Sequence, residues 1–139
     1  MRIPLFLLPL LALLLLCNSG LHAQDKAFQP MDVFDLQYAS DPQIQPEGDW
    51  IVYRRMRFDI LKDRAVGNLW MIRADGNDHQ KLTSREVAES SPRWSPSGDR
   101  LAFVSRTDEG SEIYIYWLES GKLARISQLP ESPSGLAWS

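Results

Sequence analysis

The chain has 139 residues, of which 44% are hydrophobic, with 15 lysines and arginines against 18 aspartates and glutamates and a formal net charge of −3. This charge balance excludes the broad basic surface by which proteins bind nucleic acid. The single cysteine, Cys17, excludes a disulfide bond within the chain.

The first segment, residues 1–23, is predicted to be a secretory signal peptide. Arg2 provides a positive charge, and the apolar block at 3–17 spans 15 residues. A membrane-spanning helix needs about 20 such residues, so the block fits a signal peptide better than a span. Cleavage is expected after Ala23. We therefore expect a secreted or periplasmic protein that contacts the membrane only through this segment.

Two other interpretations of the N-terminal segment remain open. Cys17 could carry a lipid, although Leu16 stands where a small residue is expected. The segment could also stay uncleaved as an anchor, because Leu21 occupies a position at which signal peptidase prefers a small residue. Cleavage after Ala23 would leave His79 as the only imidazole of the exported chain.

Residues 24–40 are predicted to be a lead-in to the folded part. Pro30 is followed by several apolar residues, which indicates a short helix or an extended segment. The sequence Ser-Asp-Pro at 40–42 is expected to end it and to start the first strand.

From residue 41 onward the sequence repeats itself. "IQPEGDWIVYRR" at 44–55 matches "WSPSGDRLAFVSR" at 94–106, and "NLWMIRADGNDHQKLT" at 68–83 matches "EIYIYWLESGKLARIS" at 112–127. A third copy begins at 134–139. The length difference between the copies falls in "FDILKDRAVG" at 58–67, which we interpret as a linker. A fixed repeat of this length indicates a repeated structural unit.

Each copy reads as short β-strands separated by turns. The runs at 49–56, 68–73, 100–105 and 112–117 are rich in β-branched and aromatic residues. The turns between them contain Pro and Gly, as in "SPSGD" at 95–99, or Gly alone, as in "ADGND" at 74–78. The pattern predicts an all-β fold in which antiparallel strands follow one another through tight turns.

Four strands per unit of about 40 to 50 residues are typical of a β-propeller blade. We predict a partial β-propeller with blade 1 and its linker at 41–90, blade 2 at 91–133 and the first strand of a third blade at 134–139. A closed propeller needs about four to eight blades, so the chain is expected to be a fragment of a longer product.

The lead-in "MDVFDLQYASDPQIQPEGDWIVYRR", followed by "NLWMIRADG", "QKLT" and "SPRWSPSGDRLAFVS", resembles the start of secreted bacterial serine peptidases of the prolyl oligopeptidase family. The resemblance is to the acylaminoacyl-peptidase-like and dipeptidyl-peptidase-like branch. It implies a propeller that gates access of short peptides to an α/β-hydrolase domain with a Ser-Asp-His triad. The partners it implies are that hydrolase domain of the same protein and a peptide substrate.

The repeat alone also resembles the non-enzymatic periplasmic propeller of the Tol–Pal system, which binds a protein partner. This is the alternative function. The parent protein is expected to be a peptidase, whereas residues 1–139 alone are expected to be inactive, since the triad and the G-x-S-x-G motif of such hydrolases match no position of the chain.

No catalytic, cofactor-binding or metal-binding residue is predicted. His79 lies in "DGNDHQKLT", at the expected exposed end of a hairpin, and is not expected to act as a base. Arg54 and Arg55 stand where an amine-binding site would need acids. Glu86 and Glu89 have the wrong spacing for an adjacent carboxylate pair and are assigned to a linker between blades.

Three further patterns have a possible function, and the structural interpretation is favoured for each. Asp75, Asn77 and His79 stand at alternate positions and resemble the start of a calcium loop. The glycine required at the sixth position is absent, and Glu86 falls at the twelfth position only by counting through a predicted strand, so a solvated turn is predicted. The basic run at 54–64 could face the hydrolase domain or an acidic substrate terminus, and is interpreted as an exposed linker. The tryptophans are predicted to be blade core: Trp50, Trp70, Trp94, Trp117 and Trp138.

Overall fold

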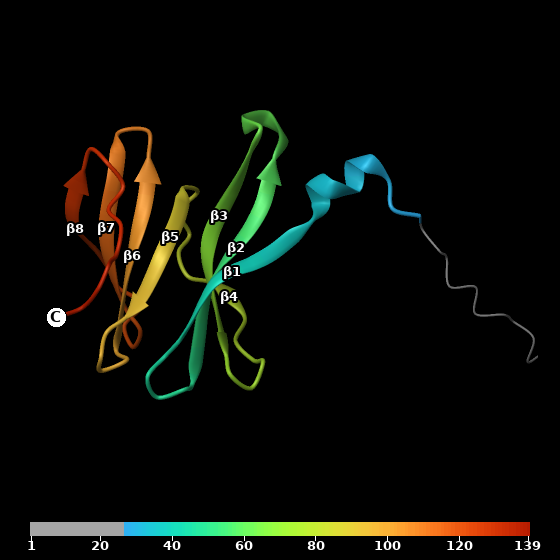
Figure 1. Ribbon diagram of the computed structural model, residues 1–139. Coiled ribbons are helices and arrows are strands. Elements are labelled where there is room, and N and C mark those ends of the chain that lie inside the picture. The colour runs from blue at the N-terminus through green and yellow to red at the C-terminus, as the bar shows by residue number, and fades with distance from the viewer. Residues whose placement is uncertain (1–26) are drawn as a thin grey trace, which may run out of the picture.

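The computed structural model describes residues 27–139 (Figure 1). The predicted signal peptide at 1–23, with its cleavage site after Ala23, lies outside the described residues. Within the described residues, none of the helices is long and apolar enough to cross a membrane.

The described chain consists of two four-stranded antiparallel sheets that follow one another in sequence. A short 3-10 helix, η1 (Pro30–Asp35), precedes them. The first sheet has the order β1-β2-β3-β4 and the second β5-β6-β7-β8. Their bounds are β1 Gln37–Ile44, β2 Trp50–Asp59, β3 Arg64–Arg73, β4 Gln80–Lys81, β5 Ala88–Trp94, β6 Arg100–Thr107, β7 Gly110–Trp117 and β8 Leu123–Leu129.

The sheets lie side by side, with β5 of the second next to the first (Figure 1). Because side chains alternate between the two faces of a strand, every second residue of β2 and β3 points toward the second sheet. Val52, Leu69 and Met71 form one side of the buried core, and Leu101 and Phe103 from β6 form the other. The all-β fold and the repeated four-stranded units predicted from the sequence are confirmed.

The β2–β3 hairpin is longer than the sequence predicted. The segment 58–67 was interpreted as a linker, but β2 continues to Asp59 and β3 begins at Arg64. Only the single turn η2 (Ile60–Lys62) and Asp63, which adopts a left-handed conformation, connect them. The extra residues of the first copy therefore extend two paired strands, in continuous register from Trp50 opposite Arg73 to Asp59 opposite Arg64, which gives their backbone groups hydrogen-bonding partners.

The strands nearest the lead-in and the linker also begin earlier than the predicted ranges. β1 begins at Gln37, which pairs with Arg57, and β5 begins at Ala88, which pairs with Arg106. The partner strands β2 and β6 are long enough for their backbone groups to pair with these additional residues.

The turn that contains Pro and Gly has the same form in both copies. Gly48 and Gly98 have φ angles of 86° and 69° and donate their N–H groups to Gln45 O and Ser95 O. Positive φ is the conformation that glycine adopts without strain. In the second copy the Asp99 carboxylate accepts hydrogen bonds from Ser97 and Ser95, which lower its pKa to about 2. The prediction that this motif serves as a turn is confirmed.

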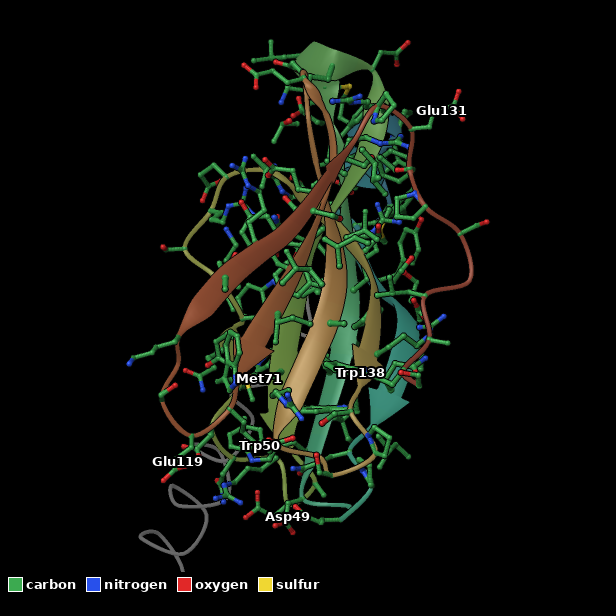
Figure 2. The ribbon with its side chains drawn as sticks, turned by 90° about the vertical axis from the view of Figure 1, so that its left-hand side faces the viewer. Asp49, Trp50, Met71, Glu119, Glu131 and Trp138 are labelled. Atoms are coloured by element: carbon green, nitrogen blue, oxygen red, sulfur yellow. The ribbon has the colours of Figure 1, made fainter. Side chains whose placement is uncertain are left out.

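A tryptophan indole connects each repeat to the previous one. Trp94 Nε1 donates to Gln43 O at 3.2 Å, and Trp138 Nε1 donates to Arg93 O at 2.9 Å. The two acceptors occupy equivalent places in the aligned copies, as do the two donors. Residues 134–139 therefore approach β5 as β5 approaches β1, and Figure 2 shows this segment returning from Glu131 to Trp138 along the second sheet.

The same segment, predicted to begin a third blade, differs from the prediction in one respect: it forms no strand. A strand requires a neighbour with free backbone N–H and C=O groups, and within residues 27–139 no segment pairs with 134–139.

The indole hydrogen bond gives the first prediction. Trp94→Phe removes the donor and leaves the part-buried Gln43 carbonyl without its partner, so the contact between β5 and β1 should weaken by about 1–2 kcal/mol. The measurement is hydrogen exchange of the β1 and β5 amides in the whole protein. Trp117→Phe is the matched control, because the Trp117 indole donates no hydrogen bond within the described chain. Equal exchange rates in the two variants would show that the Trp94 hydrogen bond does not stabilise the contact between β5 and β1.

Candidate functional site

A pocket of about 520 Å³ lies between the two sheets, at the end of the molecule that carries the β2–β3 and β6–β7 hairpins (upper end in Figure 1). Its lining comes from β2, η2, β3, the linker before β5, β5 itself and the end of β6. Five of the lining residues are cationic: Arg54, Arg57, Lys62, Arg64 and Arg106. Three are carboxylates: Asp59, Glu86 and Asp108.

Arg54 reaches this pocket because of its position in β2. It lies two residues from Val52 and two from Met56, so it shares the face of β2 that points toward the second sheet. Gly67 lies opposite Met56 on β3, and a Cβ atom there would come within 2.5 Å of Arg54 Nε and of Met56 Sδ. The absence of a side chain at position 67 thus provides the space in which the Arg54 side chain lies.

The cations are only partly neutralised. Asp59 contacts Lys62 at 3.9 Å, and Glu86 contacts Lys81 at 3.0 Å. The hydrogen bond from Lys81 lowers the pKa of Glu86 and so keeps it ionised. Arg54 Nε is buried without a hydrogen-bond partner within the described chain. The pocket therefore carries positive charge, and one N–H group of its lining residue Arg54 lacks an acceptor within the described chain.

Glu89 lies deeper between the sheets than the sequence predicted. It was assigned to a linker with Glu86, but it belongs to β5 and is fully buried, whereas Glu86 is in the linker and exposed. Its carboxylate accepts hydrogen bonds from Thr83 Oγ1 at 2.5 Å and from the Leu69 amide at 3.2 Å. Because β4 is only two residues long, the carboxylate satisfies an amide of β3.

Burial raises the pKa of the Glu89 carboxyl, because desolvation outweighs the hydrogen bonds from Thr83 and the Leu69 amide, which lower it. One carboxylate oxygen accepts from the Leu69 amide of β3 and the other from Thr83, which follows β4. The residue therefore acts as a structural connection between the sheets.

A second ionic cluster, which the sequence did not reveal, lies around Glu112 of β7. Arg125 Nη1 donates to its carboxylate at 2.8 Å, Tyr114 OH at 3.0 Å and Arg85 Nη2 at 3.3 Å. The hydrogen bond from Arg125 is the main reason that the pKa of Glu112 is lowered. Arg85 also lies over the Tyr114 ring, at 4.2 Å from its centroid. The cluster attaches the linker before β5 to the second sheet.

His79 is exposed, as the sequence predicted, and is close to aromatic side chains. Its Nε2 lies 2.6 Å from Tyr53 OH, and its ring centroid lies 5.1 Å from that of Trp70. Arg55 lies over Trp70 at 4.5 Å and does not line the pocket, since it points to the opposite face of β2 from Arg54. Among the described residues the hydroxyl next to His79 is the phenol of Tyr53, and no serine, threonine or cysteine side chain is hydrogen-bonded to the imidazole.

The calcium-like segment forms a turn that is closed by its own side chains. Asp75 accepts a hydrogen bond from the Asn77 amide at 2.9 Å and from Asn77 Nδ2 at 3.1 Å. The bond from the Asn77 amide is the largest cause of the lowered Asp75 pKa. Among residues 27–139, no group of three or more His, Cys, Asp or Glu side chains could hold a metal ion.

The five tryptophans lie in different surroundings. Trp50 and Trp94 are half-buried and pack against the core cluster, as predicted. Trp70 lies under Arg55 on the face of the first sheet that points away from the core, and Trp138 contacts Arg93 and Arg100. Trp117 is half-buried. The sequence could not separate these surroundings, because they depend on which face of a sheet each tryptophan occupies and on which segments lie against that face.

No known protein-family model matches the chain. The "Uncharacterized peptidase YuxL" of Bacillus subtilis (strain 168) is 29% identical over 109 residues, which cover 78% of this chain and 17% of that protein. "Dipeptidyl-peptidase 5" of Porphyromonas gingivalis is 28% identical over 98 residues, or 70% of this chain and 13% of that protein. The "Tol-Pal system protein TolB" of Alkalilimnicola ehrlichii is 38% identical over 80 residues, or 58% of this chain and 18% of that protein.

Solved structures identify the fold. The β-propeller domain of the Trilobed protease from Pyrococcus furiosus superposes with a TM-score of 0.55 at 21% identity, covering 68% of this chain and 28% of that one. The described chain is part of a β-propeller. An acylaminoacyl peptidase from Pyrococcus horikoshii superposes with a TM-score of 0.58 at 17% identity, covering 69% of this chain and 14% of that one.

These findings confirm the resemblance to peptidase propellers that the sequence indicated. This propeller segment spans only 17% and 13% of the two peptidases that it matches in sequence. The similarity therefore covers a propeller part of much longer proteins.

The buried carboxyl of Glu89 gives the second prediction. Its pKa is raised in the folded state, so its contribution to stability is fully present below the ordinary carboxyl pKa and declines as the pH rises through the raised value. Glu89→Gln keeps an acceptor and removes this decline. Relative to the wild type, the variant should become more stable as the pH rises from about 4 to about 7.

The measurement is hydrogen exchange of β3 and β5 amides at both pH values. Glu86→Gln is the matched control, and its pH trend should have the opposite sign, because the Glu86 pKa is lowered. A wild type and Glu89→Gln variant with parallel pH profiles would show that Glu89 is not desolvated.

Proposed function

We propose that the chain is the propeller part of a serine peptidase of the prolyl oligopeptidase family that hydrolyses short peptides. The observation that carries this proposal is the extent of sequence similarity. The match to a bacterial peptidase extends over 109 residues, whereas the match to TolB extends over 80. The peptidase similarity thus covers more than the repeated turns and strands that propellers of several functions share.

The catalytic groups would lie in an α/β-hydrolase domain elsewhere in the protein. There a serine hydroxyl would attack the peptide carbonyl, a histidine would take its proton and return it to the leaving amine, and water would then hydrolyse the acyl-enzyme. The repeated sheets described here would form one part of a ring that limits which peptides reach that site by their size.

Export is part of the proposal. The apolar block at 3–17 with Ala23 is the supporting feature of the sequence, and secretion or the periplasm is the proposed location. A peptidase that faces outside the cytoplasm would meet peptides from the surroundings.

The alternative is a non-enzymatic propeller that binds a protein, and the similarity to TolB supports it. That match has the higher identity, 38%, although it covers 58% of the chain. A binding propeller would need no hydrolase domain.

Peptide hydrolysis by the whole protein tests the proposal. We expect cleavage of short uncharged peptides, loss of that activity after treatment with a serine-directed phosphonate, and covalent labelling outside residues 27–139. The control is the same protein labelled after unfolding. A folded protein that neither reacts with the phosphonate nor cleaves any member of a short-peptide library would instead support the binding propeller.

A further inference from the structure

The pocket between the sheets contains more positive charge than its surroundings neutralise. Arg54, Arg57 and Arg64 line it and form no ion pair within residues 27–139. Two of its three carboxylates, Asp59 and Glu86, already contact lysines at 3.9 and 3.0 Å. A negatively charged ligand would neutralise part of this excess positive charge.

Arg54 is the residue that most needs such a ligand. Its Nε is buried and has no acceptor in the described part of the chain. A buried N–H without a partner costs free energy, and a charged one costs more, so an anion that accepts this hydrogen bond would remove the cost. Gly67 provides the space that lets the side chain lie in this position.

We propose that this pocket binds the carboxylate of a short peptide, with the guanidinium of Arg54 as the principal donor and Arg57 and Arg64 adding positive charge. A guanidinium offers planar, paired donors that match the two oxygens of a carboxylate. Apolar side chains, among them Val66 and Val87, line the same pocket and would contact the body of the peptide.

The lining favours a single compact anion over a polyanion. Asp59, Glu86 and Asp108 lie among the cations, and the chain as a whole carries a net charge of −3. An extended polyanion such as nucleic acid would meet these carboxylates and be repelled. One carboxylate close to Arg54 can contact the cations alone.

The peptide would be a substrate or product of the peptidase. In this respect, the origin of the ligand, the inference rests on the proposed function. Binding itself requires no hydrolysis. The two ideas can therefore fail separately, since cleavage of uncharged peptides tests the enzyme and preference for a free carboxylate tests the pocket.

Calorimetric titration of the whole protein with two matched probes tests the proposal. The probes are an acetylated alanine dipeptide with a free C-terminal carboxylate and the same peptide as its amide, and mass spectrometry verifies that both stay intact. The free acid should bind at least about tenfold more tightly, as expected for a charge-assisted hydrogen bond, and added salt should reduce the difference.

Neighbouring arginines supply the matched variants. Arg54→Gln should abolish the preference for the acid, whereas Arg55→Gln, which removes the same charge from the opposite face of β2, should retain it. Gly67→Ala changes no charge but places a Cβ atom within 2.5 Å of Arg54 Nε, so it should weaken binding of the acid by displacing that side chain.

Exposed residues keep the test valid if Arg54→Gln does not fold. Arg57→Gln should reduce the preference for the acid severalfold, and Lys122→Gln, in the turn between β7 and β8, should leave it unchanged. Equal binding of acid and amide by the wild type would overturn the proposal. So would an equal effect of Arg54→Gln and Arg55→Gln, which would indicate a general charge effect. If the wild type binds neither probe because an acidic segment of the same protein fills the pocket, the proposal is also wrong.

Discussion

The contact between the two sheets determines most of what this chain can do. Val52, Leu69 and Met71 from the first sheet pack against Leu101 and Phe103 from the second, and all five are almost completely removed from solvent. A single four-stranded sheet of this size cannot bury both of its faces, so each repeat depends on its neighbour for its apolar core. The position of every other group, including the basic pocket, follows from how these faces meet.

Hydrogen bonds between the two repeats reinforce this contact at several places. The Glu89 carboxylate reaches from β5 to an amide of β3, and the Trp94 indole reaches from β5 to a carbonyl of β1. Gln45 Nε2 donates to Gly98 O at 2.8 Å, which joins the corresponding turns of the two repeats. Apolar packing has no preferred direction, whereas these hydrogen bonds fix how one sheet is placed on the other.

The same inward face of β2 changes character along its length. Val52 belongs to the apolar core, and Arg54, two residues further, lies at the pocket where the long β2–β3 hairpin extends beyond the core. The hairpin lengthens the first repeat compared with the second and gives the pocket several of its lining residues. A propeller repeat can acquire a binding surface in this way without any change to the packing on which its stability depends.

The sequence by itself determined the repeated unit, the strands and the turns, because these depend on local residue preferences and on a period of two that any strand shows. The sequence pattern around 46–48 and 96–98 was sufficient to place both turns. It could not show that 58–67 is mostly paired strand, since an exposed hairpin with many charges has the composition of a linker.

Only the tertiary structure decided which face each side chain occupies relative to the neighbouring repeat. Adjacent residues Arg54 and Arg55 are identical in type, yet one lines the pocket and the other lies over Trp70 on the opposite face. Glu86 and Glu89 were equivalent in the sequence, yet one is exposed and the other is fully buried. The physical reason is that burial and unpaired charge depend on contacts between segments that lie far apart in the chain. A local sequence pattern does not specify such contacts.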